Sequence, residues 1–229
     1  MPPPIVLSVG GSLIVPKSGI DVAFLKSFRT LIRKHVHHGR RFIIVVGGGT
    51  TARNYQQAAK AIVPLASEDM DWMGIHATRL NGHLLRTLFR DIALHRVVKD
   101  PTRPLVWNRQ ILIAAGWKPG WSTDYVAVRL ARKFGATTVI NLTNTDGVYD
   151  KDPSLHEDAR RVDRIDWPSF RKIVGNHWEP GANAPFDPIA SRLAHKWRMT
   201  VAVMKGSQLR NVDAFLLGKK FKGSVIGDC

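Results

Sequence analysis

The sequence Phe-Ile-Ile-Val-Val-Gly-Gly-Gly at residues 42–49 places an apolar run directly before three glycines. A short, continuous apolar run of this kind predicts a buried strand, and the glycines predict a turn at its carboxyl end. Thr50 or Thr51 can then cap a helix that runs toward Ile62. A buried strand followed by a glycine turn and a helix is typical of a parallel sheet covered by helices on both faces.

The same alternation continues along the rest of the chain. Residues 5–12, Ile-Val-Leu-Ser-Val-Gly-Gly-Ser, predict a second buried strand that also ends in a glycine turn. Further helices are expected at 21–38, 69–94, 124–134, 167–174, 187–197 and 209–217. Further strands are expected at 96–98, 104–106, 111–113, 137–142, 200–204 and, as a closing edge strand, 224–226. The turn-rich segment 144–166 suits an irregular hairpin region. The expected fold is therefore an α/β, three-layer α/β/α sandwich with a mainly parallel central sheet.

Length and cysteine content limit the class of protein. The chain has 229 residues, enough for one large domain or two small ones, and a core of this size needs no disulfide or metal to stabilise it. The single cysteine is Cys229, so we expect no disulfide framework and a reducing, cytoplasmic setting. No long apolar run predicts a membrane-spanning helix, and the opening Met-Pro-Pro-Pro lacks the pattern of a signal peptide.

The charge is strongly basic and uneven. The chain has 34 Lys and Arg against 18 Asp and Glu, a net charge of +16. Residues 1–64 have a net charge of +8, and 65–149 and 150–229 have +4 each. A basic excess favours anionic partners, namely nucleic acid, phosphorylated metabolites or acidic membrane surfaces. The alternative is that the charge serves only solubility.

The glycine clusters indicate a ligand site. In open parallel sheets, ligands bind beyond the carboxyl ends of the strands, and both glycine turns fall at that edge together with the helix start at Ser122 or Thr123. Bare backbone amides at a helix start suit a phosphate. Neither cluster matches the P-loop or the Gly-x-Gly-x-x-Gly pattern, so a P-loop NTPase is excluded and a standard dinucleotide fold is disfavoured.

Polar residues near these turns are candidates for phosphate and nucleoside contacts. Arg53 lies one helical turn past the glycines, within reach of a phosphate, or else it lies on a solvated face. Asp71 can accept hydrogen bonds from ribose hydroxyls or simply cap a helix. Residues 122–124, Ser-Thr-Asp, offer hydroxyls and helix amides. Residues 143–149, Thr-Asn-Thr-Asp-Gly-Val-Tyr, add an aromatic ring that can lie against a base, and Asp152 follows them.

These motifs occur in the order seen in the amino-acid kinase family, which the chain resembles over nearly its whole length. Within that family it is most similar to uridylate (UMP) kinases of the archaeal type. The motifs that carry the resemblance are Gly10-Gly11-Ser12, Gly47-Gly48-Gly49 with Arg53, Asp71-Trp72-Met73-Gly74-Ile75, Thr123-Asp124, residues 143–153 and Phe186-Asp187-Pro188. The Thr-Asn-x-Asp-Gly-Val-Tyr stretch is the most specific of them.

The resemblance implies phosphoryl transfer from ATP to UMP, with Mg²⁺, in a single domain over residues 1–229. Its acceptor-binding part would cover about 1–135 and its ATP-binding part about 136–229. The ATP contacts it implies are Gly11, Ser12, Gly49, Arg53, Thr143, Asn144, Tyr149 and Asp152. The UMP contacts it implies are Gly48, Asp71, Trp117, Lys118, Pro119, Gly120, Trp121, Ser122 and Thr123. UMP kinases of this family are typically hexamers built from dimers, so a homo-oligomer, hexamer or dimer, is expected.

The chain departs from the family pattern at two places. Common bacterial members have Lys where this chain has Ser8, so Lys17, Arg53 or Mg²⁺ would supply the cation that phosphoryl transfer needs. Asp124 and Asp187, the carboxylates nearest the phosphoryl path, would orient cations or metal. Trp117 and Trp121 stand in the acceptor loop where smaller or polar residues are usual. They either reshape the acceptor pocket or pack in a subunit contact.

Two other readings remain open. The first is a related kinase of the same fold that acts on carbamate, an amino-acid carboxylate or isopentenyl phosphate. The second is a protein without catalysis that binds a nucleotide, RNA or an oxyanion, which the +16 charge supports. No known RNA-binding module is visible in the sequence.

Overall fold

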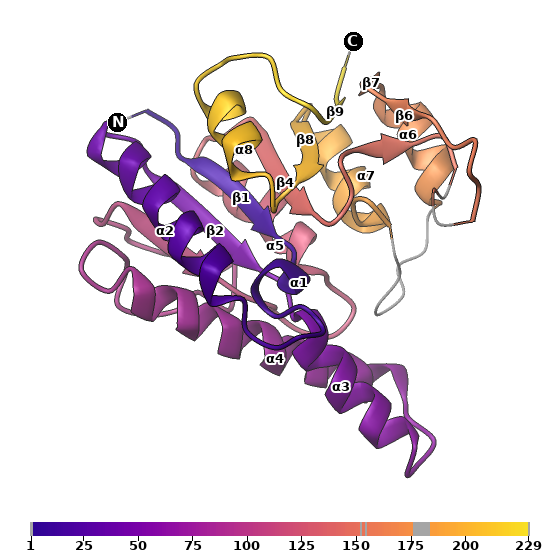
Figure 1. The fold of residues 1–229 in the computed structure, drawn as a ribbon. Helices are drawn as coiled ribbons and strands as arrows, with labels where there is room; N and C mark the ends of the chain where they lie inside the picture. Colours follow the sequence, from indigo (N-terminus) through magenta and orange to yellow (C-terminus); the bar gives the residue numbers. More distant parts are fainter. Residues whose placement is uncertain (1, 152, 154, 176–183, 229) are drawn as a thin grey trace.

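A computed structural model of the chain describes residues 2–151, 153, 155–175 and 184–228. Over these residues, seven strands form one sheet in the order β3-β2-β1-β4-β8-β9-β7 (Figure 1). Neighbouring strands are parallel except β8 and β9, which are antiparallel. The strands of this sheet are β1 (Ile5–Val9), β2 (Phe42–Val46), β3 (Ile111–Ala114), β4 (Thr138–Thr143), β7 (Arg164–Ile165), β8 (Thr200–Lys205) and β9 (Ser224–Ile226).

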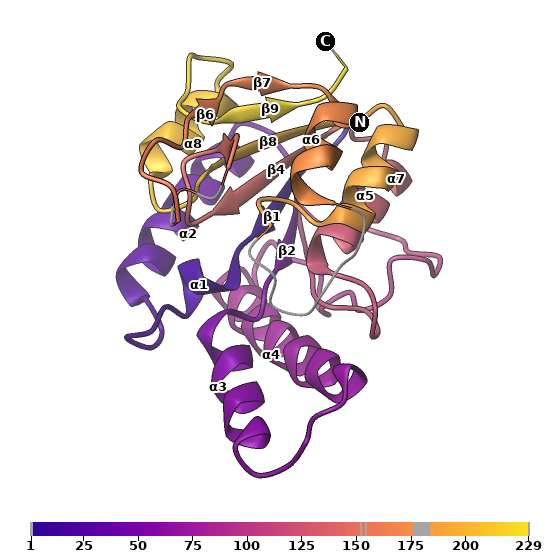
Figure 2. The same ribbon diagram turned by 90° about the vertical axis from the view of Figure 1, so that its right-hand side faces the viewer.

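Helices cover both faces of the sheet, so the predicted three-layer sandwich is confirmed. Side chains alternate along each strand: Val6 and Val139 point toward the core under α5, α6 and α7, while Leu7 and Ile140 point toward the core under α2, α4 and α8. Figure 2 shows α2 and α8 on one side of the sheet and α5, α6 and α7 on the other. The helices are α1 (Gly11–Ile14), α2 (Val22–His37), α3 (Gly49–Lys60), α4 (Ser67–Leu88), α5 (Thr123–Lys133), α6 (Trp167–Val174), α7 (Pro188–Lys196) and α8 (Leu209–Leu216).

Four helices begin at a side chain that caps them. Asp21 accepts from the backbone N–H of Phe24 at 2.8 Å, and Ser122 accepts from that of Tyr125 at 3.1 Å. Asp166 and Asp187 cap α6 and α7 in the same way. A capping side chain satisfies one of the free N–H groups of the first turn, which fixes where the helix starts.

The prediction was wrong between residues 89 and 110. The expected helix over 69–94 ends at Leu88, and the expected strands at 96–98 and 104–106 are absent from this described segment. Instead, isolated bridges join Ala93 to Ile111 and Val98 to Ala114. Buried apolar residues of the segment, among them Ala93 and Val98, cover the edge of β3, and prolines at 101 and 104 lack the N–H that a strand ladder needs.

Three further elements differ from or refine the expectation. The turn expected after β1 is the one-turn helix α1. Strand β9 was expected at the sheet edge but lies between β8 and β7, because the short β7 adds a further strand. The irregular region 144–166 contains a small antiparallel pair, β5 (Val148–Tyr149) and β6 (Arg161–Val162), as well as β7. Among the described helices, none is both long enough and apolar enough to cross a membrane.

Candidate active site

The glycine turns meet where the sheet order changes direction. From β1 the chain passes to β2 on one side of it, and β4 lies on its other side. Gly10 follows β1, Gly47 follows β2 and Asn144 follows β4, so all three loops leave the same edge of the sheet. Crevices of this kind are where open α/β sheets bind ligands. The prediction that the glycine turns share one edge is confirmed.

The two glycine turns touch each other through their backbones. A Cβ added to Gly11 would lie 2.1 Å from the backbone nitrogen of Gly49, and one added to Gly47 would lie 2.6 Å from that of Gly11. Gly49 also has a φ of +64°, which side chains rarely tolerate. These glycines are therefore required by the contact itself. The contact brings together the starts of α1 and α3, whose free N–H groups favour an anion.

Side chains from two other elements hold these turns in place. Asn81 of α4 donates its Nδ2 hydrogens to the carbonyl oxygens of Gly47 and Gly48, at 2.9 and 3.1 Å. Asn144 donates to the Ser12 hydroxyl at 2.9 Å and so ties the loop after β4 to the loop after β1. The sequence reading overlooked Asn81. Its signal was a polar residue on the buried face of a helix, where an unpaired amide would be costly.

Side chains of α4 hold the loop between β3 and α5 by four hydrogen bonds, one of them a long bond of 3.4 Å from Arg79 to the carbonyl oxygen of Gly116. The buried Asp71 accepts through Oδ2 from the N–H of Gly120 at 2.7 Å, and Thr78 accepts through its hydroxyl from the N–H of Gly116 at 2.8 Å. Arg79 donates to the carbonyl oxygen of Trp117 at 2.9 Å. Burial raises the pKa of Asp71, although the hydrogen bond from Gly120 opposes this effect. Thr78 and Arg79 were also missed from the sequence.

The two tryptophans of this loop pack on α5. The Trp121 ring lies 4.1 Å from the ring of Tyr125, and the Trp117 ring lies parallel to Tyr125 at 6.3 Å. Both rings are half-buried against the core under α5. The Lys118 ammonium lies over the Trp117 ring at 4.5 Å, a cation–π contact. The aromatic contacts give this loop a fixed shape beside the glycine turns.

Two carboxylates lie together where α5 and α7 begin. Asp124 accepts through Oδ1 from the hydroxyl of Ser8 at 2.7 Å and through Oδ2 from the N–H of Asp187 at 3.2 Å. Asp187 uses Oδ1 to cap α7, while its buried Oδ2 accepts no hydrogen bond from the described residues. Burial raises the pKa of Asp124. Burial, and then the neighbouring Asp124, raise the pKa of Asp187 to about 7.

The remaining predicted residues are spread around this crevice. Arg53 is exposed on α3 and donates to the Thr50 hydroxyl at 3.0 Å, and Lys17 is exposed in the turn after α1. Thr143 ends β4. Tyr149 donates its hydroxyl to Asp146 at 2.5 Å, which raises the pKa of Tyr149. Pro119 belongs to the loop before α5, and Thr123 is the first residue of that helix. Asp152 lies outside the described residues.

Comparison with known proteins gives one consistent result. The sequence model of the amino acid kinase family matches residues 3–205. The chain is 35% identical over 208 residues to the uridylate kinase of Methanococcus aeolicus, covering 89% of this chain and 91% of that protein. It is 32% identical over 233 residues to the uridylate kinase of Hyperthermus butylicus, covering 98% of each.

Solved structures show the same similarity. The uridylate kinase of Archaeoglobus fulgidus superposes with a TM-score of 0.81 at 28% identity, covering 98% of this chain and 100% of that one. The UMP kinase of Bacillus anthracis superposes with a TM-score of 0.78 at 19% identity, covering 98% of this chain and 95% of that one. At this lower identity the second likeness concerns the fold alone.

Proposed function

Because the chain belongs to the amino acid kinase family, we propose that it transfers the γ-phosphoryl group of ATP to UMP and so produces ADP and UDP. The observation that carries the proposal is the contact between the turns of Gly11 and Gly49 beside the loop held by Asp71. This contact brings together two helix starts whose free N–H groups would suit phosphates, next to a separate loop held by hydrogen bonds, which supports transfer between two phosphorylated ligands. Similarity to uridylate kinases over nearly the whole chain supports UMP as the acceptor.

On the donor side, backbone amides and one arginine would hold the ATP phosphates. We assign the phosphates to Gly11, Ser12 and Gly49, whose N–H groups lie at or near the starts of α1 and α3. Arg53 is exposed on α3, one helical turn after Gly49, and would reach the transferred group. The nucleoside of ATP would contact Thr143, Asn144, Tyr149 and Asp152. This division makes about 136–229 the ATP-binding part and about 1–135 the acceptor part.

On the acceptor side, α4 and its loop would hold UMP. One carboxylate oxygen of Asp71 accepts a hydrogen bond from the N–H of Gly120, and the second oxygen would accept one from a ribose hydroxyl. The phosphate of UMP would meet Ser122 and Thr123 at the start of α5. The remaining acceptor contacts would be Gly48, Trp117, Lys118, Pro119, Gly120 and Trp121.

The transfer itself requires no covalent bond between the protein and the phosphoryl group. A phosphate oxygen of UMP attacks the γ-phosphorus, the bond from that phosphorus to the β,γ-bridging oxygen breaks, and ADP leaves with the electron pair. No general base is needed, because the acceptor oxygen is already anionic. The protein therefore acts by positioning and by stabilising charge, and Arg53 or Lys17 would supply a cation in place of the lysine that Ser8 replaces.

The carboxylates fit a magnesium ion that arrives with ATP. Mg²⁺ typically takes one or two protein carboxylates and completes its shell with phosphate oxygens and water. The Oδ2 of Asp187, which accepts no hydrogen bond from the residues that the structure describes, would be such a ligand, whereas both oxygens of Asp124 are engaged by hydrogen bonds. When bound, the ion neutralises charge on the phosphates. Asp124 would then hold the backbone of Asp187, and with it the start of α7, in position.

A panel of acceptors tests the proposal. ADP release should be measured with ATP, Mg²⁺ and, in turn, UMP, CMP, AMP, GMP, carbamate and isopentenyl phosphate. We expect turnover with UMP and little with the purine nucleotides. Turnover with carbamate or isopentenyl phosphate alone would instead assign the protein to a related kinase of the same fold. Failure of every acceptor would leave only a binding protein.

The assembly is also part of the proposal. We expect a homo-oligomer, hexamer or dimer, in a cytoplasmic setting. Large apolar side chains are exposed on and after α3 and on α4, among them Tyr55 (68%), Ile62 (82%) and Leu80 (64%), and a subunit contact would cover them. Light scattering of the purified protein measures the assembly, and a monomer would contradict it.

A further inference from the structure

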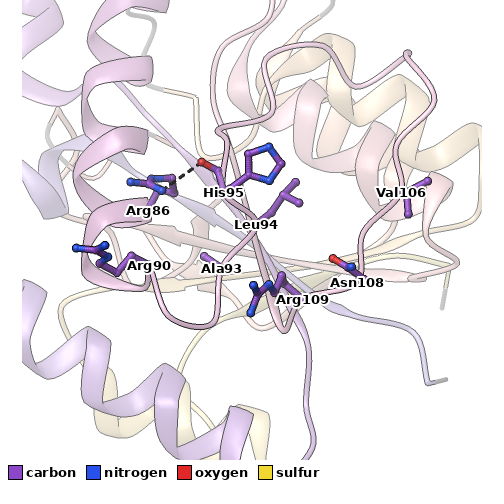
Figure 3. A pocket seen from close by; sticks show the side chains of 8 residues that line it. All are labelled: Arg86, Arg90, Ala93, Leu94, His95, Val106, Asn108 and Arg109. Atoms are coloured by element: carbon purple, nitrogen blue, oxygen red, sulfur yellow. Dashed lines mark hydrogen bonds between the residues drawn. The ribbon is translucent and has the colours of Figure 1, made fainter.

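A strongly basic hollow lies at the outer edge of the sheet, away from the glycine turns. It encloses about 460 Å³ between the end of α4 and the segment that precedes β3. Figure 3 shows Arg86, Arg90 and Arg109 around it, with His95 and Asn108. Arg109 lies just before the amino end of β3, whereas the glycine turns follow the carboxyl ends of β1 and β2. The hollow is therefore separate from the candidate active site.

A second hollow of about 630 Å³ adjoins the first one, because His95 lines both. Its walls carry Arg96, Lys99 and Arg103. We call the six side chains of the two hollows, Arg86, Arg90, Arg96, Lys99, Arg103 and Arg109, the basic edge. Arg86 is half-buried, and the other five are exposed.

Few negative charges balance the basic edge. Asp100 is the single carboxylate among the residues that line the two hollows, and it already binds Arg103 at 3.3 Å. Asp91, which lies nearby in the sequence, is paired with Arg33 at 2.7 Å. Six cations held close together repel one another, so the surface gains free energy when an anion binds there.

Arg86 indicates where such an anion would enter. One terminal nitrogen of its guanidinium donates to the carbonyl oxygen of His95 at 3.2 Å. Its Nε is buried and has no hydrogen-bond partner in the described part of the chain. A charged donor group with an unmatched hydrogen is costly to bury, and an anion in the hollow that Arg86 lines would offset the charge of its guanidinium.

We propose that the basic edge binds the phosphate backbone of a nucleic acid. The extent of the surface favours a polyanion, because its cations continue across two adjoining hollows, farther than one small anion needs. A symmetric contact with a second copy of this chain is disfavoured at this surface, because it would bring two basic edges of like charge together. Contacts of this kind go to phosphates, so the binding is independent of base sequence. The inference does not depend on the proposed kinase activity.

A salt titration tests this inference. The probe is a fluorescein-labelled, mixed-sequence RNA of about 20 nucleotides, followed by anisotropy between roughly 50 and 200 mM NaCl. UMP and a non-hydrolysable ATP analogue are kept saturating so that the candidate active site is filled. We expect the logarithm of the association constant to fall linearly with the logarithm of salt concentration.

Two double variants decide where the RNA binds. Arg90→Ala/Arg109→Ala removes two exposed charges from the basic edge, and Lys219→Ala/Lys220→Ala removes two exposed charges after α8. The first variant should reduce the salt slope by about 1.4, since each phosphate contact to a single strand contributes about 0.7. Its affinity should fall on the order of 10-fold, whereas the second variant should bind like the wild type. Should the first variant fail to fold, Arg96→Ala/Lys99→Ala replaces it.

Several results would overturn the proposal. Absence of salt-dependent RNA binding is one, and equal losses in both double variants are another, because they would indicate diffuse charge. Displacement of the RNA when the ATP analogue is raised well beyond the concentration that fills the candidate active site would assign the surface to a small ligand. A change of oligomeric state in Arg90→Ala/Arg109→Ala, with RNA binding unchanged, would assign it to a second copy of the chain.

Discussion

The hydroxyl of Ser8 donates to Oδ1 of Asp124 at 2.7 Å and so joins the middle of β1 to the start of α5. Ser8 is buried, and the second oxygen of Asp124 accepts from the N–H of Asp187. The orientation of the Asp124 carboxylate is thus fixed at both oxygens. Ser8, which stands where bacterial relatives were expected to carry lysine, orients a carboxylate that in turn holds the start of α7.

Replacing Ser8 should therefore affect the chemical step. Ser8→Ala removes one of the two donors that orient Asp124, and we expect kcat to fall about 10-fold, as losing one such hydrogen bond of about 1.4 kcal/mol implies. The KM values for ATP and UMP should change little. Ser8→Thr keeps the hydroxyl and should restore most of the rate in the same steady-state assay. An equal loss of kcat in both variants would attribute the effect to packing and would contradict a role for the Ser8 hydroxyl in orienting Asp124.

Arg53 should act on the transferred phosphoryl group. Arg53→Ala should lower kcat on the order of 100-fold, the effect of removing one donor that stabilises transition-state charge. Lys60→Ala removes a charge from the far end of the same helix and is the matched control. An unchanged kcat in a folded Arg53→Ala protein would show that Arg53 is only a solvated surface residue.

Asp71 should act on the acceptor alone. An asparagine at this position can still accept from the N–H of Gly120 through its carbonyl oxygen but has no charge to offer a ribose hydroxyl. Asp71→Asn should raise the KM for UMP on the order of 10-fold and leave the KM for ATP unchanged. Asp69→Asn, on an exposed position in the first turn of α4, is the control. A raised KM for ATP alone would reverse the assignment of the two substrate loops.

The contact between the glycine turns should be intolerant of a methyl group. Gly11→Ala places Cβ against the backbone of Gly47 and Gly49, and we expect a loss of stability of at least about 1–3 kcal/mol. Gly74 lies in the interior of α4 with only ordinary contacts around its Cβ position, so Gly74→Ala should raise stability by about 0.5–1 kcal/mol. Urea denaturation measures both. Similar effects at the two positions would contradict the close approach of the turns.

The stability should depend on pH through Asp187. Its pKa is raised from 3.8 to about 7 in the folded protein, so between these pH values the native state binds more protons than the unfolded state. The free energy of unfolding contributed by this group therefore falls as the pH rises through that window. Asp187→Asn keeps an oxygen to cap α7 and removes the charge, so it should raise Tm more at about pH 8 than at about pH 4.

The cap of α6 provides the opposite case. Hydrogen bonds from Ser169 lower the pKa of Asp166, so its contribution to stability is present above its unfolded pKa and is lost as the pH falls. Asp166→Asn should therefore cost more stability near neutral pH than in acid. If the stability of the two variants depended on pH in the same way, that result would contradict the raised pKa of the buried Asp187.

The sequence predicted the elements that have strong local signals. Strands such as 42–46 are continuous apolar runs, and Asp21 and Ser122 are caps at the predicted helix starts. The prediction of strands in the segment 89–110 failed because Val97 and Val98 are buried by covering the edge of β3, whereas Val106 is exposed. Local sequence does not distinguish either case from a strand of the sheet.

The candidate site was only partly predictable for a similar reason. The glycines and the order of the motifs predict phosphate-binding loops. The side chains that hydrogen-bond to those loops, however, come from distant positions in the sequence. Ser8 and Asp124 are 116 residues apart, and Thr78 and Asn81 act through backbone groups of loops that the sequence does not place beside α4. Such contacts are set by how helices pack on the sheet, and no short-range pattern carries them.

Helix α4 contacts both substrate loops, through Asn81 for the glycine turns and through Asp71, Thr78 and Arg79 for the loop before α5. A shift of this one helix on binding one substrate would therefore be transmitted to the loop that we propose receives the other. Thermodynamic linkage then requires the coupling to be reciprocal. If bound ATP changes the affinity for UMP by some factor, bound UMP changes the affinity for ATP by the same factor.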